Sequence, residues 1–145
     1  GSYFDDDPVW KERAAVFSRK AMDLTEYLVN VGYSPRQHAD VTFTYHDPCH
    51  LVRGQGIREQ PRNLLKATGI FVEMNEADTC CGGAGSFHVD YPGIAADILA
   101  KKRANIEQTG AGIVVTACPG CLIQLTKAAK DSGNKFKAMH ISQVI

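Results

Sequence analysis

The residues of this chain whose type and spacing could do chemistry are its five cysteines, Cys49, Cys80, Cys81, Cys118 and Cys121. Two of them are adjacent and come directly before Gly82 and Gly83, and two others form a Cys-Pro-Gly-Cys sequence. Five cysteines cannot all pair off, and a disulfide between neighbours would close a small, strained ring. Because the chain also lacks a secretory signal segment, the cysteines favour metal or redox chemistry over a disulfide framework.

The stretches between the cysteines predict strands that alternate with helices. Runs rich in β-branched, aromatic and other apolar residues predict strands at 41–45, 70–74, 112–117 and 135–140. Helices are expected at 58–68, 92–109 and 122–133, and the second of these carries an apolar stripe of Ile94, Ala95, Ile98, Leu99 and Ile106. This alternation predicts an α/β fold with a small, mostly parallel four-stranded sheet flanked by helices.

In such a fold all five cysteines follow the carboxyl end of a strand and precede the next helix. Loops at the carboxyl ends of parallel strands gather at one edge of the sheet, where ligands bind. Helix amino termini in that region favour thiolates over thiols. The topology therefore predicts that cysteines far apart in the sequence lie together in space.

The amino-terminal part of the chain predicts one long helix over residues 8–31. Asp7 is suited to cap its start and Gly32 to end it, and an apolar face suggests packing against its own domain rather than a coiled coil. We interpret residues 1–2 as the remnant of a cleaved expression tag, residues 3–39 as this helix and a linker, and residues 40–145 as the cysteine-bearing domain. The chain is expected to be an excised piece of a longer protein.

Composition excludes several classes of protein. Lysine and arginine balance aspartate and glutamate at 16 each, which argues against a nucleic-acid partner. No apolar run approaches the ~20 residues that cross a bilayer, so we expect a cytoplasmic domain that reaches a membrane only through a complex. The basic residues after Cys49, namely Arg53, Arg58, Arg62 and Lys66, are interpreted as a solvated helix face rather than a docking patch.

Four interpretations of the cysteines remain open on residue chemistry. They could be buried small hydrophobic residues, or Cys118 and Cys121 could form a dithiol redox site with Cys118 as the attacking thiolate. A structural zinc needs four ligands and leaves a cysteine unused, although His46 and His50 could also ligate it. An iron–sulfur cluster uses all five thiols, since adjacent cysteines can reach different irons, and the small residues Gly82, Gly83 and Gly85 let backbone N–H groups approach the inorganic sulfides.

The three segments HDPCH, CCGGAGSFH and TACPGC resemble the cysteine-rich CCG domain family. That pattern has one cysteine, then Cys-Cys-Gly about thirty residues on, then Cys-x-x-Cys; here 30 residues separate Cys49 from Cys80 and 36 separate Cys81 from Cys118. The resemblance covers about residues 40–145. It is greatest to the iron–sulfur subunits of glycolate oxidase and lactate-utilisation enzymes, and the family also includes the cysteine-rich subunit of heterodisulfide reductase.

The resemblance implies an electron-transfer domain of an oxidoreductase complex, without catalytic residues of its own. The five cysteines would ligate a [4Fe-4S]-type cluster, non-cubane as in the cysteine-rich subunit of heterodisulfide reductase, with zinc as the alternative metal. Partners implied by the family are the rest of the same polypeptide (a second CCG domain and a ferredoxin-like segment) and a flavin-containing dehydrogenase subunit. The single copy here departs from the usual two and suggests a carboxyl-terminal copy.

Overall fold

The computed structural model describes residues 2–35 and 40–145, which form two units, 1–33 and 34–145. Residue 1 of the predicted tag remnant and residues 36–39 of the predicted linker lie outside the described residues. The predicted boundary between the linker and the cysteine-bearing domain, after residue 39, stays a prediction.

The first unit contains two helices where the sequence predicts one. After a 3₁₀ turn, η1 (Ser2–Phe4), come α1 (Pro8–Lys20) and α2 (Leu24–Asn30). The Asp7 carboxylate accepts from the amides of Val9 and Trp10, so the predicted cap is confirmed. The single-helix prediction is wrong because Ala21 is extended and Asp23 caps a new start, accepting from the amide of Thr25.

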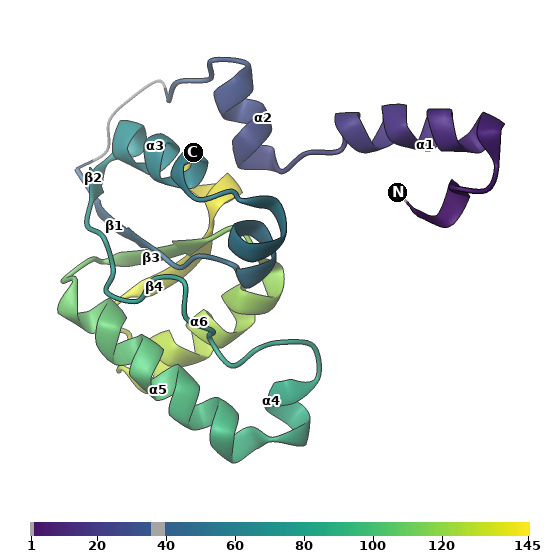
Figure 1. Cartoon of the computed structure of the whole chain (residues 1–145). Helices are drawn as coiled ribbons and strands as arrows, with labels where there is room; N and C mark the ends of the chain where they lie inside the picture. Colours follow the sequence, from purple (N-terminus) through teal and green to yellow (C-terminus); the bar gives the residue numbers. More distant parts are fainter. Residues whose placement is uncertain (1, 36–39) are drawn as a thin grey trace. The chain divides into compact units, whose positions relative to one another are not determined.

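The second unit is built on a four-stranded sheet in the order β2-β1-β3-β4, with every pair parallel (Figure 1). The strands are β1 (Thr42–Tyr45), β2 (Ile70–Phe71), β3 (Ile113–Thr116) and β4 (Lys137–His140). In register, Phe43 pairs with Ile113 and Ile113 with Lys137. The predicted α/β class and parallel sheet are confirmed.

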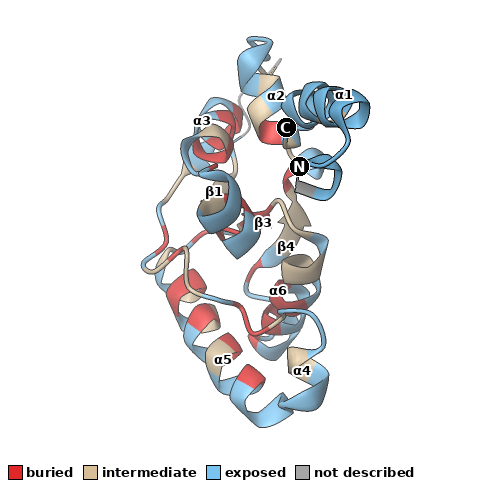
Figure 2. Cartoon of the chain, turned by 45° about the vertical axis from the view of Figure 1, so that its right-hand side comes forward, coloured by how far each residue is buried: buried red, intermediate tan, exposed pale blue. Residues whose placement is uncertain are grey.

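Helices cover both faces of this sheet. Figure 1 shows α3 (Glu59–Thr68) on one side, and α5 (Pro92–Gln108) and α6 (Pro119–Asp131) on the other. The period of two in β1 and β3 divides the core accordingly: Tyr45 and Val115 pack with Leu65 of α3, whereas Val114 packs with residues of α5 and α6. Figure 2 shows the buried residues on one side of α5 and exposed residues on the other.

Several boundaries differ from the prediction. The strand expected at 70–74 keeps only Ile70–Phe71, because the chain then turns to bury Met74 in the core. Helix α6 begins inside the Cys-Pro-Gly-Cys sequence, and two short helical elements were not anticipated: the π-helical turn η2 (His50–Gln55) and α4 (Phe87–Asp90). A final 3₁₀ turn, η3, spans Ile141–Gln143. Ile94 of the predicted stripe is exposed, and the buried positions of α5 are Ala95, Leu99, Lys102, Asn105 and Ile106.

The strand order places a topological switch point between β1 and β3. The chain passes from β1 to β2 on one side, and then crosses back so that β3 lies on the other side of β1. The loops that leave β1 and β3 therefore diverge to opposite faces of the sheet and open a crevice between them. Cys49 follows β1 and Cys118 follows β3, so both flank this crevice.

The face covered by α3 offers a test of the core assignment. Leu65 is fully buried among Phe43, Tyr45, Val115 and Ile141. We expect Leu65→Ala to lower the free energy of unfolding by about 2–5 kcal/mol, because the side chain loses its transfer energy and leaves a cavity. Urea unfolding followed by circular dichroism measures the change, and the exposed Ile123 changed to Ala is the matched control, expected to have little effect. Equal effects of the two variants would contradict the assignment.

Candidate metal centre

All five cysteines line one cavity of about 340 Å³ at the carboxyl edge of the sheet. The other residues that line it are His46, Asp47, His50, Gly83, Ala84, Gly85 and Gly120. Residues from three separate segments of the chain thus meet in one place, at the crevice that the strand order creates. Gly82, which the sequence also suggested, is not among the lining residues.

The cysteines lie in the three segments that follow β1, β2 and β3. Cys49 is the cap residue just before the π-helical turn η2, an irregularity that is often found at functional sites. Cys118 is the amino-terminal cap residue of α6, with extended backbone, and Cys121 lies in the first turn of that helix. Cys80 and Cys81 lie in the loop between β2 and α4.

The cysteines lie at different depths, and the adjacent pair is split between them. Cys81 is 2% exposed, whereas its neighbour Cys80 is exposed, as is Cys49. Cys118 and Cys121 are intermediate. The side chains of Cys80 and Cys81 therefore lie at different depths of the same cavity. This explains why two cysteines can be adjacent without forming a disulfide.

The deepest donors form a compact trio. Ligand atoms of His46, Cys81 and Cys121 all lie within 4.8 Å of one another. A hydrogen bond from Cys121, with help from His46 and the Gly83 amide, lowers the pKa of Cys81 to about 4 although burial acts the other way. The same hydrogen bond and burial raise the pKa of Cys121. These opposite shifts favour a thiolate at Cys81 that accepts a hydrogen bond from the Cys121 thiol.

His46 is a buried polar residue whose ring has an unused hydrogen-bonding atom. It is 1% exposed, and its amide donates to the Val115 carbonyl at 2.9 Å, which fixes the residue to the end of β3. Its Nδ1 atom has no hydrogen-bond partner within residues 2–35 and 40–145. A buried ring nitrogen of this kind has the chemistry of a metal ligand or of a hydrogen-bond donor to sulfur.

The glycines after the cysteine pair are required by space and by backbone conformation. Gly82 has a φ of +80°, and a Cβ there would lie 2.8 Å from the carbonyl oxygen of Ala95 in α5. The Gly82 amide donates to Cys80 Sγ at 3.3 Å. A Cβ at Gly83 would lie 2.7 Å from Gln124 Cγ and 3.6 Å from Cys81 Sγ. Gly82 thus lets the loop approach α5, and Gly83 leaves room beside the thiolate.

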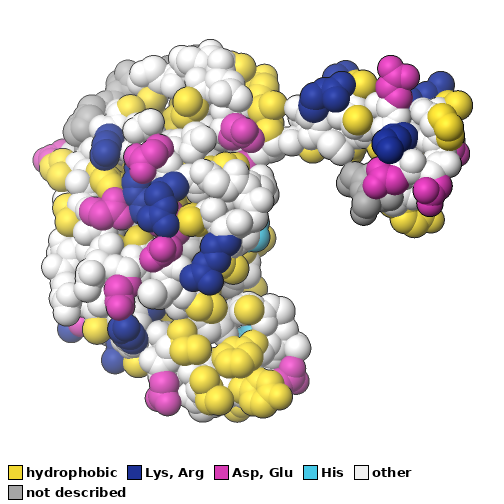
Figure 3. All heavy atoms as spheres, in the orientation of Figure 1, with side chains coloured by type: hydrophobic (Ala, Val, Ile, Leu, Met, Phe, Trp, Pro, Cys, Tyr) yellow, Lys and Arg dark blue, Asp and Glu magenta, His cyan; other side chains and the backbone are white. Residues whose placement is uncertain are grey.

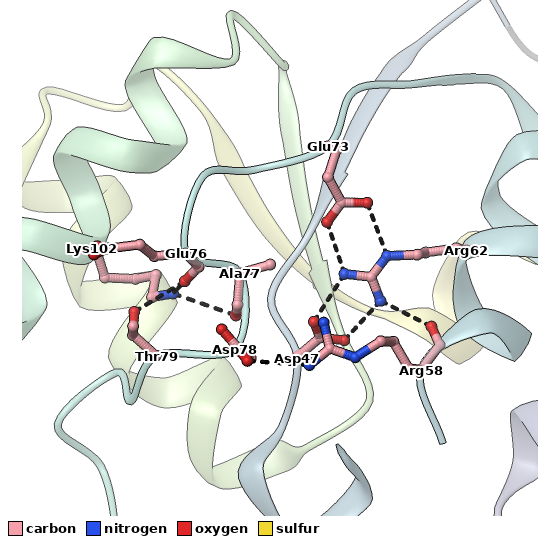
Figure 4. Close-up of polar contacts among 9 residues, drawn as sticks. All are labelled: Asp47, Arg58, Arg62, Glu73, Glu76, Ala77, Asp78, Thr79 and Lys102. Atoms are coloured by element: carbon pink, nitrogen blue, oxygen red, sulfur yellow. Dashed lines mark hydrogen bonds and ion pairs between the residues drawn. The ribbon is translucent and has the colours of Figure 1, made fainter. Parts of the chain in front are cut away.

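An ion network ties the two cysteine loops together behind the cavity (Figure 4). The Arg62 guanidinium bonds both oxygens of Asp47 at 2.8 Å and both oxygens of Glu73 at 2.8 and 2.7 Å. Burial opposes the charged form of Arg62, but the hydrogen bonds to these two carboxylates raise its pKa.

In the same view, Lys102 donates to the Glu76 carbonyl at 2.6 Å. Burial lowers the pKa of Lys102, although the negative charge of Cys81 acts against this.

The network corrects the sequence interpretation of the basic residues. Arg62 is 5% exposed and does not belong to a solvated face, because its guanidinium turns inward to Asp47. Spacing could have revealed this, since Arg62 stands three residues before Leu65 on the buried face of α3. Lys102 shows the same spacing on α5, because it lies between Leu99 and Ile106 on the buried face of that helix. A charge on an apolar stripe indicates a buried ion pair or hydrogen-bonded cation.

The exposed charges on this side do not form a patch of one sign. Figure 3 shows lysine and arginine side chains interleaved with aspartate and glutamate. Arg58 pairs with Asp78 at 3.0 Å, and both side chains are 45% exposed. The surface therefore gives no support to a docking patch for an acidic partner, in agreement with the sequence interpretation.

The amino-acid sequence is similar to those of several known proteins. The family model for the CCG cysteine-rich domain matches residues 43–126. The chain is 37% identical over 147 residues to the probable glycolate oxidase iron-sulfur subunit of Bacillus subtilis, which covers 97% of this chain and 33% of that protein. It is 34% identical over 146 residues to lactate utilization protein A of Lysinibacillus sphaericus, covering 98% and 64% respectively.

A third relative is an uncharacterized iron-sulfur protein of Methanococcus maripaludis, 42% identical over 123 residues, or 80% of this chain and 25% of that protein. The chain thus spans between a quarter and two thirds of the length of these three relatives. Separately, none of the helices in the described part of the chain has the length and apolar character needed to cross a membrane.

Proposed function

This chain belongs to the CCG cysteine-rich domain family, and from that premise we propose that it is an iron–sulfur electron-transfer domain of an oxidoreductase. The observation that carries the proposal is the meeting of five thiols around one cavity of about 340 Å³. Such a space suits a cluster of several irons and sulfides better than a single ion.

The donor set also suits a cluster. Five thiols exceed the four that a cubane [4Fe-4S] cluster uses, and they favour the non-cubane type in which adjacent cysteines reach different irons. Cys81 would hold it from the buried side, Cys118 and Cys121 from an intermediate depth, and Cys49 and Cys80 from the exposed side. When bound, the cluster would supply one-electron transfer, and the protein would set its potential through ligation, burial and N–H donors such as the Gly82 amide.

The relatives suggest the setting of this electron transfer. Their names refer to glycolate oxidase and to lactate utilisation, so we infer that electrons come from a flavin-containing subunit that oxidises a hydroxy acid. The remainder of a longer polypeptide, with a second CCG domain and a ferredoxin-like segment, would pass them on. Five free thiols suit a reducing compartment, which supports a cytoplasmic location.

Metal analysis of protein purified without oxygen tests the proposal. We expect several irons per chain with matching acid-labile sulfide, together with visible absorption that bleaches on addition of dithionite. The reason is that a buried thiolate and four further thiols around one cavity can neutralise and enclose several ferric or ferrous ions. The control is the same preparation treated with a chelator and an oxidant. One zinc per chain with no iron would contradict the cluster.

The zinc-stabilised interaction domain remains a second candidate because of one specific observation. His46, Cys81 and Cys121 place three ligand atoms within 4.8 Å of one another, as a tetrahedral zinc site requires, and Cys118 could be the fourth ligand. This site would leave Cys49 and Cys80 unused. The dithiol alternative has less support, because it gives no role to Cys49, Cys80 and Cys81, which line the same cavity.

A further inference from the structure

We propose that Arg62 and Asp47 are positioning residues that hold the Cys49 loop and the Cys80–Cys81 loop at a fixed distance from each other, so that the cavity is formed before metal binds. The inference rests on the proposed function, because it concerns the ligand loops of that site. Arg62 does not line the cavity, and Asp47 lines it with its side chain fully buried. Both act through the loops that they join (Figure 4).

Arg62 is fully engaged in bridging the two loops. Its Nε and one Nη2 hydrogen bond go to Glu73, and Nη1 and Nη2 donate to the two oxygens of Asp47. A second bond from Nη1 goes to the Arg58 carbonyl at 2.8 Å, so all five donors of the guanidinium have acceptors. A lysine carries the same charge but cannot make this planar, two-sided contact.

Asp47 is the point where the two loops meet. It lies two residues before Cys49, and its amide donates to the carbonyl of Ala77, three residues before Cys80, at 3.1 Å. The Lys102 ammonium donates to the same carbonyl at 3.3 Å. Both Asp47 oxygens accept hydrogen bonds from Arg62, so this carboxylate is held toward Arg62 although it borders the cavity.

A contribution to stability alone does not account for this pair. Burying two charges costs desolvation free energy, and the attraction between the charges offsets only part of it. Apolar residues of similar volume often stabilise a core to the same extent as a buried ion pair. What an apolar pair cannot supply is a fixed orientation, because four short, directional hydrogen bonds set the Asp47 and Glu73 carboxylates relative to one another. Outer groups of this kind orient metal ligands in other sites.

The experiment separates positioning from stability. Wild type, Arg62→Lys, Arg62→Met and the double variant Asp47→Asn with Arg62→Met are compared by iron and sulfide uptake, by the electron paramagnetic resonance line shape of the reduced cluster, and by thermal unfolding of the metal-free protein. The double variant avoids an unpaired buried carboxylate, so it is expected to fold even if Arg62→Met does not. Phe136→Leu is the control, since Phe136 is buried in the core before β4, at the opposite edge of the sheet from the cavity.

We expect metal affinity to fall about tenfold or more in both variants that carry Arg62→Met, and to fall less in Arg62→Lys. The electron paramagnetic resonance line shape should be broadened in all three variants. Phe136→Leu should lose thermal stability and keep wild-type uptake and line shape. A double variant with wild-type uptake and line shape would overturn the inference, as would a control that loses uptake to the same extent.

A metal-free readout keeps this inference distinct from the proposed function. Cys49 and Cys80 are both exposed and border the same cavity, so a short bis-maleimide, which adds to two thiols, can join them in the apo protein. We expect this cross-link, mapped by peptide mass, to form about tenfold more slowly in the double variant. If wild type binds no iron, the proposed function fails and the cross-linking rate still decides the inference; an unchanged rate would overturn it.

Discussion

Replacement of Cys81 by serine is expected to abolish metal binding. Cys81 is 2% exposed and accepts hydrogen bonds from Cys121 and His46 that lower its pKa, so this ligand lies where water cannot replace it. Loss of an outer group that only orients a ligand already costs about 10–100-fold in metal affinity, and loss of this ligand should cost more. Iron and sulfide per chain after anaerobic reconstitution measure the effect.

Cys80→Ser is the matched control, because it makes the same change at the adjacent residue. Cys80 is exposed, so water or an added thiol can fill the vacated position. We expect this variant to bind less metal than wild type, as a five-thiolate site requires, and to be partly restored by added thiol. Full metal binding in Cys80→Ser would instead favour the zinc site, in which Cys80 is spare. A Cys81→Ser variant that keeps its metal would contradict the assignment of Cys81 as the deep ligand.

Replacement of Gly82 by alanine is expected to cause the largest loss of stability from a single added methyl group. The φ of +80° is strained for alanine and costs about 1–3 kcal/mol. The new Cβ would also lie 2.8 Å from the backbone oxygen of Ala95, and relieving that overlap costs about 1–3 kcal/mol more. Urea unfolding of the metal-free protein, followed by circular dichroism, gives the change in free energy.

Gly85→Ala provides the control for backbone strain alone. Gly85 also has a positive φ, of +52°, but a Cβ there meets nothing within 4 Å. The difference between the two variants therefore isolates the contact with α5. Equal losses would mean that α5 moves away from the loop at no cost, and would contradict the close packing of Gly82 on Ala95.

Much of the fold follows from local patterns in the sequence. The β-branched runs at 42–45 and 113–116 form strands, and Pro92 and Pro119 start helices as their fixed φ allows. Alternation of these elements dictates a parallel sheet, and a parallel sheet carries its loops to one edge. The meeting of the five cysteines was predictable for this reason, from chain order and without any knowledge of contacts.

The predictions that were wrong concern competition between neighbouring residues. The apolar spacing over 8–31 fits one helix, but Asp23 caps a second start through the Thr25 amide and divides it. The strand expected at 70–74 is short because Met74 turns into the core and Glu73 turns to Arg62. In each case a local pattern allowed two conformations, and a hydrogen bond, an ion pair or burial selected one.

The sequence by itself determined the class of fold, the family pattern and the set of five thiols, because these depend on residue type, spacing and chain order. Only the tertiary structure decided which of the adjacent cysteines is buried, that the surroundings of Cys81 lower its pKa, and that Arg62 faces Asp47 rather than solvent. Burial, proton sharing and ion pairing arise between side chains that are distant in sequence, and their energies depend on separations of a few ångströms. Those separations exist only once the sheet has brought the loops together.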